Sequence, residues 1–113
     1  MIPVPRDALP DALAAQIPRG LHGAPFTEVF TDTRSPVRGA LFFALQGERF
    51  DAHEHLENAI DGGAGGLVIS RTDALPDRLP EGCLVAVVGD TRKALGGLGH
   101  YVRDRLSAPV VAI

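Results

Sequence analysis

The stretch Thr31-Asp32-Thr33-Arg34-Ser35-Pro36 leads through Gly39 into Leu41-Phe42-Phe43-Ala44-Leu45, and Gln46-Gly47-Glu48-Arg49-Phe50-Asp51-Ala52-His53 follows. Its apolar middle shows no period-2 alternation, which predicts a strand covered on both faces. Pro36 and Gly39 indicate a turn before that strand, because proline presets φ and glycine tolerates positive φ. Two polar loops therefore flank one buried strand, and together they could line a cleft for a polar ligand.

The composition predicts one soluble, compact domain. A chain of 113 residues with 45% apolar and 22% charged residues can bury a core without disulfides or metal. A net charge of −3, scattered basic residues and few aromatics give no electrostatic footprint for nucleic acid, so we expect none as a partner. Cys83, the single cysteine, is expected to be a small buried hydrophobe rather than a reactive thiol.

Membrane and targeting signals are not found in the sequence. The N-terminus has no basic region followed by an apolar stretch of signal length, and no apolar run is long enough to span a bilayer. We therefore expect a cytoplasmic protein without a membrane partner.

The remaining apolar runs predict an α/β fold with a two-layer, mostly parallel or mixed sheet. Asp51 can cap a helix whose first turn carries Glu54, and a helix between two apolar strands is a βαβ unit. A second helix should begin after its N-cap Asp90, and we expect its glycines to permit close packing on the sheet. We expect helices over 11–17, ended by Pro18, over 51–61 and over 91–106, and further strands over 26–31, 67–70, 84–88 and 110–113.

Several patterns that resemble active sites have simpler interpretations. The run Gly62-Gly63-Ala64-Gly65-Gly66 follows a helix and opens a strand, the reverse of a phosphate loop, and the single lysine, Lys93, is not in a Walker sequence. His53 and Glu57 are spaced i, i+4 without a third ligand, so we assign no metal and expect a solvated helix start. The sequence shows no Ser-His-Asp or Cys-His spacing, so we predict no catalytic residue. Asp32 is as consistent with a turn-stabilising role as with a ligand contact.

The sequence from Thr31-Asp32-Thr33-Arg34 through Gly39 to His53, then Ala59 and Gly62-Gly63-Ala64, resembles the N-terminal domain of the Mur ligases. The resemblance is sharp from Thr31 to Arg71 and around Val88-Gly89-Asp90-Thr91-Arg92. The segment Glu48-Arg49-Phe50-Asp51-Ala52-His53 is most similar to the branch that adds D-alanyl-D-alanine to UDP-N-acetylmuramoyl-tripeptide. The fold implied is that of the N-terminal domain shared by this branch and its sister branch.

The resemblance implies that residues 1–108 bind the UDP end of the muramoyl substrate and that residues 109–113 begin a central ATP-binding domain. Arg34 or Arg49 can pair with the diphosphate, and the choice stays open. The implied substrate-binding residues are Thr31, Asp32, Thr33 and Arg34 in the first loop and Gly47, Glu48, Arg49 and Phe50 in the second.

Catalysis in this family requires ATP and Mg²⁺, which the resemblance assigns to the central and C-terminal domains. By itself the chain is expected to bind no cofactor and to have no ligase activity. Two alternatives remain: the sister ligase that adds the third peptide residue, and a non-catalytic module that binds a nucleotide sugar. A protein-interaction domain without a ligand would leave the polar content of both loops unexplained.

Overall fold

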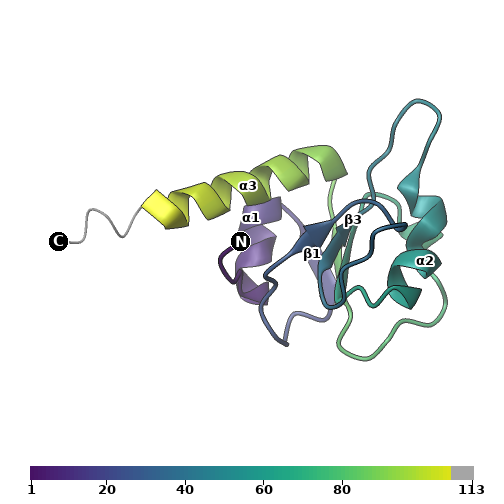
Figure 1. The fold of residues 1–113 in the computed structure, drawn as a ribbon, viewed down its shortest axis with the longest axis horizontal. Coiled ribbons are helices and arrows are strands. Elements are labelled where there is room, and N and C mark those ends of the chain that lie inside the picture. The colour runs from purple at the N-terminus through teal and green to yellow at the C-terminus, as the bar shows by residue number, and fades with distance from the viewer. Residues whose placement is uncertain (108–113) are drawn as a thin grey trace.

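The computed structural model describes residues 1–107, which form a five-stranded sheet with helices packed against it (Figure 1). The expected strand over 110–113 lies outside the described residues. The elements in chain order are η1 (Arg6–Ala8), α1 (Leu9–Leu13), β1 (Gln16–Arg19), β2 (Val29–Phe30), β3 (Leu41–Phe43), η2 (Ala52–His55), α2 (Leu56–Asp61), β4 (Gly66–Ile69), η3 (Thr72–Ala74), β5 (Leu84–Val87) and α3 (Thr91–Ser107), where η denotes a 3₁₀-helix.

The strands are ordered β1-β5-β4-β3-β2 across the sheet. The four strands β2 to β5 are mutually parallel, and β1 pairs antiparallel with β5. Phe42 of β3 lies opposite Leu67 of β4, and the helical segment between these strands completes the expected βαβ unit. Because the parallel strands point the same way, the loops that follow all four lie together at the carboxyl ends of these strands. This end of the sheet is called its carboxyl edge.

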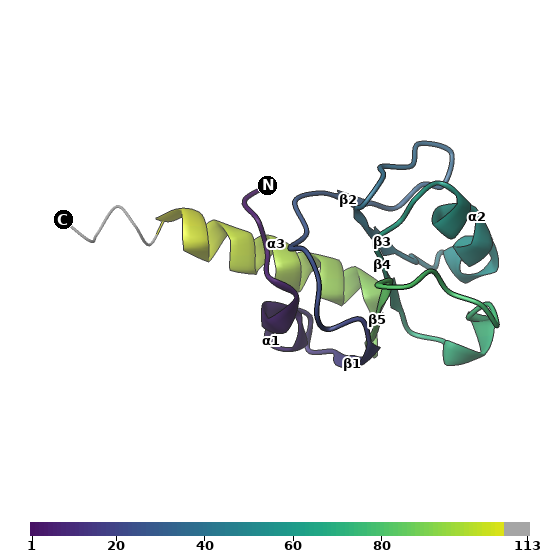
Figure 2. The same cartoon turned by 90° about the horizontal axis from the view of Figure 1, so that it is seen from below.

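The central strands β3, β4 and β5 are buried on both faces, as their apolar sequences predicted, whereas the edge strand β1 is mostly exposed. Leu41 and Phe43 pack into a cluster with α1 and α3, whereas Phe42 packs into a second cluster with α2. Figure 2 shows α1 and α3 on one side of the sheet and α2 on the other. The mostly parallel, mixed sheet is confirmed, but the layers number three rather than two, since strands that are apolar on both faces need a cover on each.

The N-terminal helix differs from the expectation over 11–17. It spans Leu9–Leu13 and ends at Ala14, whose left-handed φ of 52° turns the chain into β1. Pro18 therefore lies in a strand instead of ending a helix. Proline lacks the N–H that donates hydrogen bonds between strands, but β1 is the outermost strand of the sheet, where a missing donor is tolerated. The error arose because strand pairing with β5 is a long-range contact that the local pattern did not show.

The helix α3 begins as predicted after Asp90, whose Oδ1 accepts hydrogen bonds from the backbone N–H groups of Arg92 (2.9 Å) and Lys93 (3.1 Å). Its glycines were expected to approach the sheet, but Gly97 faces α1 instead. A Cβ built on Gly97 would lie 2.6 Å from the carbonyl oxygen of Ala12, so this glycine permits close helix–helix contact.

Two further properties of the described residues bear on the predictions. Cys83 is buried, as expected, and burial raises the pKa of its thiol. No helix within residues 1–107 combines the length and apolar character that crossing a membrane requires.

Candidate functional site

A hollow of about 620 Å³ opens where the loops after β2 and β3 meet. It lies at the carboxyl ends of parallel strands, the place where ligands bind in open α/β sheets. Its lining combines polar groups with apolar side chains, and consists of Thr31, Asp32, Thr33, Arg34, Leu45, Gly47, Phe50, His55 and Arg92.

The first loop is held by Asp32. Its Oδ1 accepts a hydrogen bond from the backbone N–H of Arg34 (2.9 Å), and its carboxylate also binds the Arg34 guanidinium, with Nη2 and Oδ2 2.9 Å apart. These hydrogen bonds from Arg34 lower the pKa of Asp32 to about 2. Asp32 thus stabilises the turn, as one of the two interpretations predicted, and it also engages the charge of Arg34.

The second loop is closed by backbone hydrogen bonds at its base. The N–H of Gly47 donates to the carbonyl of Phe50 (2.7 Å), and the N–H of Ala52 donates to the carbonyl of Leu45 (3.0 Å). This closure presents Phe50 to the hollow with 58% of its surface exposed. The ring stacks on His55, with centroids 5.4 Å apart and planes inclined by 14°. An exposed flat ring of this kind can receive a planar base.

A second hollow of about 500 Å³ shares two residues, Gly47 and Arg92, with the first. It extends along the same sheet edge past the ends of β4 and β5. Its lining is mainly polar and consists of Gln46, Gly47, Glu48, Ser70, Gly89, Asp90, Thr91 and Arg92.

The structure brings together most of the residues predicted to bind substrate. Six of them line the first hollow, namely Thr31, Asp32, Thr33, Arg34, Gly47 and Phe50. Glu48 lines the second hollow, and Arg49 lines neither of the two. The sequence interpretation missed Arg92 and His55. The polar turn Gly89-Asp90-Thr91 after an apolar strand was the available signal for Arg92, because it marks another strand end at the same edge.

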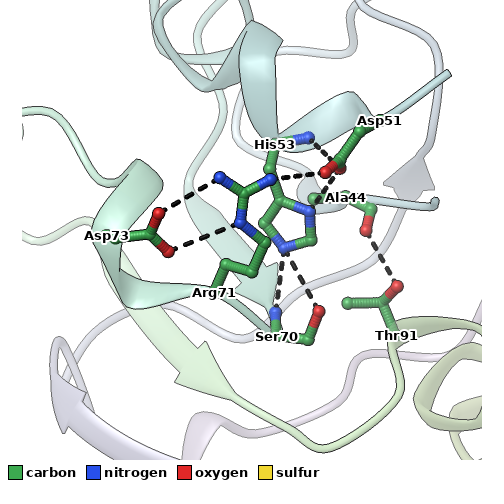
Figure 3. Close-up of polar contacts among 7 residues, drawn as sticks. All are labelled: Ala44, Asp51, His53, Ser70, Arg71, Asp73 and Thr91. Atoms are coloured by element: carbon green, nitrogen blue, oxygen red, sulfur yellow. Dashed lines mark hydrogen bonds and ion pairs between the residues drawn. The ribbon is translucent and has the colours of Figure 1, made fainter.

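Two separate sets of polar contacts tie together the ends of three strands (Figure 3). His53 is 2% exposed, and its ring lies between Asp51 and Ser70. Thr91 is also buried, and its hydroxyl donates a 2.8 Å hydrogen bond to the carbonyl of Ala44. These bonds fix the loops after β3, β4 and β5 relative to one another.

The hydrogen bonds of His53 define its tautomer. The N–H of Ser70 donates to Nε2 (3.0 Å), so that nitrogen carries a lone pair, and Nδ1 donates its proton to Oδ1 of Asp51 (2.6 Å). Burial opposes the charge of Asp51, but hydrogen bonds from His53 and from Arg71 (2.6 Å) outweigh it and hold the pKa of Asp51 below its usual value. The prediction of a solvated helix start is therefore wrong for His53, because these long-range partners bury the ring.

The described part of the chain holds no cluster of three or more His, Cys, Asp or Glu side chains that could bind a metal ion. Glu57 is exposed, and the ring nitrogens of His53 are engaged by protein groups. The arrangement offers hydroxyls, stacked rings, backbone groups and two arginines, Arg34 and Arg92, which is a set suited to binding a polar, partly aromatic, anionic molecule.

Comparison with known sequences relates this chain to peptidoglycan ligases. No protein-family model matches it. The UDP-N-acetylmuramoyl-tripeptide–D-alanyl-D-alanine ligase of Escherichia coli is 44% identical over the whole chain, which covers 23% of that ligase. The ligase of the same name from Haemophilus influenzae is 41% identical over 76% of the chain, covering 18% of the ligase. A UDP-N-acetylmuramoyl-L-alanyl-D-glutamate–2,6-diaminopimelate ligase from Parabacteroides distasonis is 34% identical over 75% of the chain, and the match covers 17% of that ligase.

Solved structures agree with the sequences. A crystal structure of MurF from Acinetobacter baumannii superposes with a TM-score of 0.77 and 31% identity, over 91% of this chain and 21% of that one. The chain therefore belongs to the Mur ligase family and has the fold of the family's N-terminal domain. Within the family it corresponds to that domain of MurF, the D-alanyl-D-alanine-adding ligase. It spans about a fifth of the length of these relatives.

Proposed function

We propose that this chain anchors the UDP end of UDP-N-acetylmuramoyl-tripeptide for a ligase that adds D-alanyl-D-alanine during peptidoglycan synthesis in the cytoplasm. The observation that carries the proposal is the meeting of the two polar loops in one hollow at the carboxyl edge of the sheet. The relatives' names give the ligand class, since they act on UDP-linked muramoyl peptides.

The lining of the first hollow suits a uridine. The exposed ring of Phe50, stacked on His55, offers a platform for the uracil face. Thr31 and Thr33 supply hydroxyls that can both donate to and accept from uracil edges or ribose oxygens. The Asp32 turn holds these two threonines in place, because its Oδ1 closes the loop from within.

The rest of the ligase reaction is assigned to parts of a longer protein. Residues 1–108 would be the UDP-binding domain, and central and C-terminal domains of the same chain would supply the ATP and Mg²⁺ chemistry of amide formation. The relatives' much greater length supports this division. The 113-residue chain alone is accordingly expected neither to hydrolyse ATP nor to form the amide bond.

Calorimetric titration of the chain with UDP tests the proposal. We expect saturable binding, and Phe50→Ala should weaken it by about fivefold or more because a base-stacking surface is lost. Leu106→Ala is the matched control, since Leu106 is equally exposed at 58% but lies near the C-terminal end of α3. Absence of UDP binding by the unmodified chain would contradict the proposed function.

A further inference from the structure

We propose that Arg92 of α3 is the residue that pairs with the diphosphate, which lies across Gly47 at the boundary between the two hollows. This inference rests on the proposed function and resolves which cation the diphosphate meets. Gly47 and Arg92 are the two residues common to both linings, so a ligand that occupies both hollows passes between them.

The other arginines near the carboxyl edge are either paired with carboxylates or lie outside both hollows. The guanidinium of Arg34 binds the carboxylate of Asp32, and that of Arg71 binds Asp51 (2.6 Å) and Asp73 (3.1 Å). Arg49 lines neither hollow. The guanidinium of Arg92 makes no hydrogen bond or ion pair with any of residues 1–107, although it lines both hollows. It can therefore offer its full planar donor set to phosphate oxygens.

The start of α3 does not itself provide the anion site. The first-turn N–H groups of Arg92 and Lys93 are taken by Oδ1 of Asp90. The positive character at this point of the edge therefore comes from the Arg92 side chain rather than from free backbone donors.

Charge also determines how deep the phosphates can lie. Glu48 and Asp90 line the second hollow, and their carboxylates would repel a phosphate that entered it. The diphosphate is thus favoured at the shared boundary, beneath Arg92. The second hollow would then receive the uncharged, hydroxyl-bearing part of the ligand, to which Gln46, Ser70 and the two carboxylates can hydrogen-bond.

The test compares uridine, UMP and UDP as ligands of the unmodified chain and of Arg92→Ala. The unmodified chain should bind UDP more tightly than uridine. Arg92→Ala should weaken UDP binding by roughly tenfold to a hundredfold, the loss expected for a charge-assisted hydrogen-bonding pair, while uridine binding stays unchanged. Arg92→Lys should retain part of the preference, because an ammonium keeps the charge but not the planar fork.

Lys93→Ala is the matched control. It removes one positive charge from the next residue of the same helix turn, and Lys93 lines neither hollow. The UDP affinity of Lys93→Ala should equal that of the unmodified chain. In the unmodified chain, the preference for UDP over uridine should decline as the salt concentration is raised. If Arg92→Ala keeps the full preference for UDP over uridine, this inference is overturned while the proposed function stands. If the unmodified chain binds neither ligand, both are overturned.

Discussion

The backbone N–H of Ser70 donates a 3.0 Å hydrogen bond to Nε2 of His53, across 17 positions of sequence. Ser70 directly follows β4, and His53 belongs to the segment that closes the loop after β3. Because Nδ1 of the same ring binds Asp51, the imidazole joins two neighbouring strand ends through a buried bridge. The position of the Gln46 to Phe50 loop therefore depends on a residue that does not line the ligand hollows.

Replacement of His53 by alanine should destabilise the fold strongly. It leaves the Ser70 N–H without its acceptor, removes one of the two hydrogen bonds that Oδ1 of Asp51 accepts from residue 53, and opens space behind the loop, so we expect a loss of about 2 to 4 kcal/mol. Urea unfolding measures this loss. The matched control is His100→Ala, because His100 is exposed and pairs with Asp104 on the surface of α3; its effect should stay within about 0.5 kcal/mol. Equal effects of the two changes would contradict the bridging role.

Stability should fall at acid pH because of Asp51. Its pKa is lower in the folded chain than in the unfolded one, so in the acid range the unfolded state binds more protons. The stabilisation is complete above the ordinary aspartate pKa of about 3.9 and is lost as the pH falls through the lower folded value. Asp51→Asn should be less stable at pH 7 and lose less further stability on acidification. Urea unfolding at several pH values would refute this if the two pH profiles were parallel.

Two adjacent glycines of α3 should respond in opposite directions to alanine. A Cβ on Gly96 would meet nothing within 4 Å, so Gly96→Ala should stabilise the chain by about 0.5 to 1 kcal/mol through helix propensity. A Cβ on Gly97 would lie 2.6 Å from the backbone oxygen of Ala12, so Gly97→Ala should destabilise by about 1 to 3 kcal/mol. Thermal unfolding of both variants gives the comparison, and stabilisation by Gly97→Ala would show that α1 is not packed as described.

The turn at Asp32 should affect UDP binding by the first loop but contribute little to the stability of the fold. Asp32→Ala removes the acceptor for the Arg34 N–H and frees the Arg34 guanidinium, both of which are exposed. We expect little change in the urea midpoint but weaker UDP binding, because Thr31 and Thr33 lose their fixed geometry. Asp77→Ala, an exposed change outside both ligand hollows, serves as the control. A large loss of stability would contradict this division of roles.

The parts of the fold that the sequence predicted are those governed by local patterns. The uninterrupted run from Leu41 to Ala44 indicated a strand buried on both faces, and the structure confirms it. Asp90 was identified as an N-cap because capping depends only on the next few residues. The first and second polar loops were also placed correctly around one hollow, since each follows a strand of the same parallel sheet.

The parts that were missed depend on contacts between distant residues. The pairing of β1 with β5 converts Gln16–Arg19 from an expected helix end into an edge strand. The sequence placed His53 at a solvated helix start, and only its contact with Ser70 shows that the ring is buried. Arg92 joined the site because β5 ends beside β4, an arrangement that no spacing along the chain specifies.

Chemical-shift mapping by ¹H–¹⁵N NMR during titration with UDP would show whether both polar loops contact the ligand. We expect saturable shifts in the amides of Thr33 and Gly47, which come from different loops and line the same hollow, with small changes at Gly20 and Gly82 near the opposite end of the sheet. Shifts confined to one loop, or no shifts at Thr33 and Gly47 at saturating UDP, would contradict this expectation.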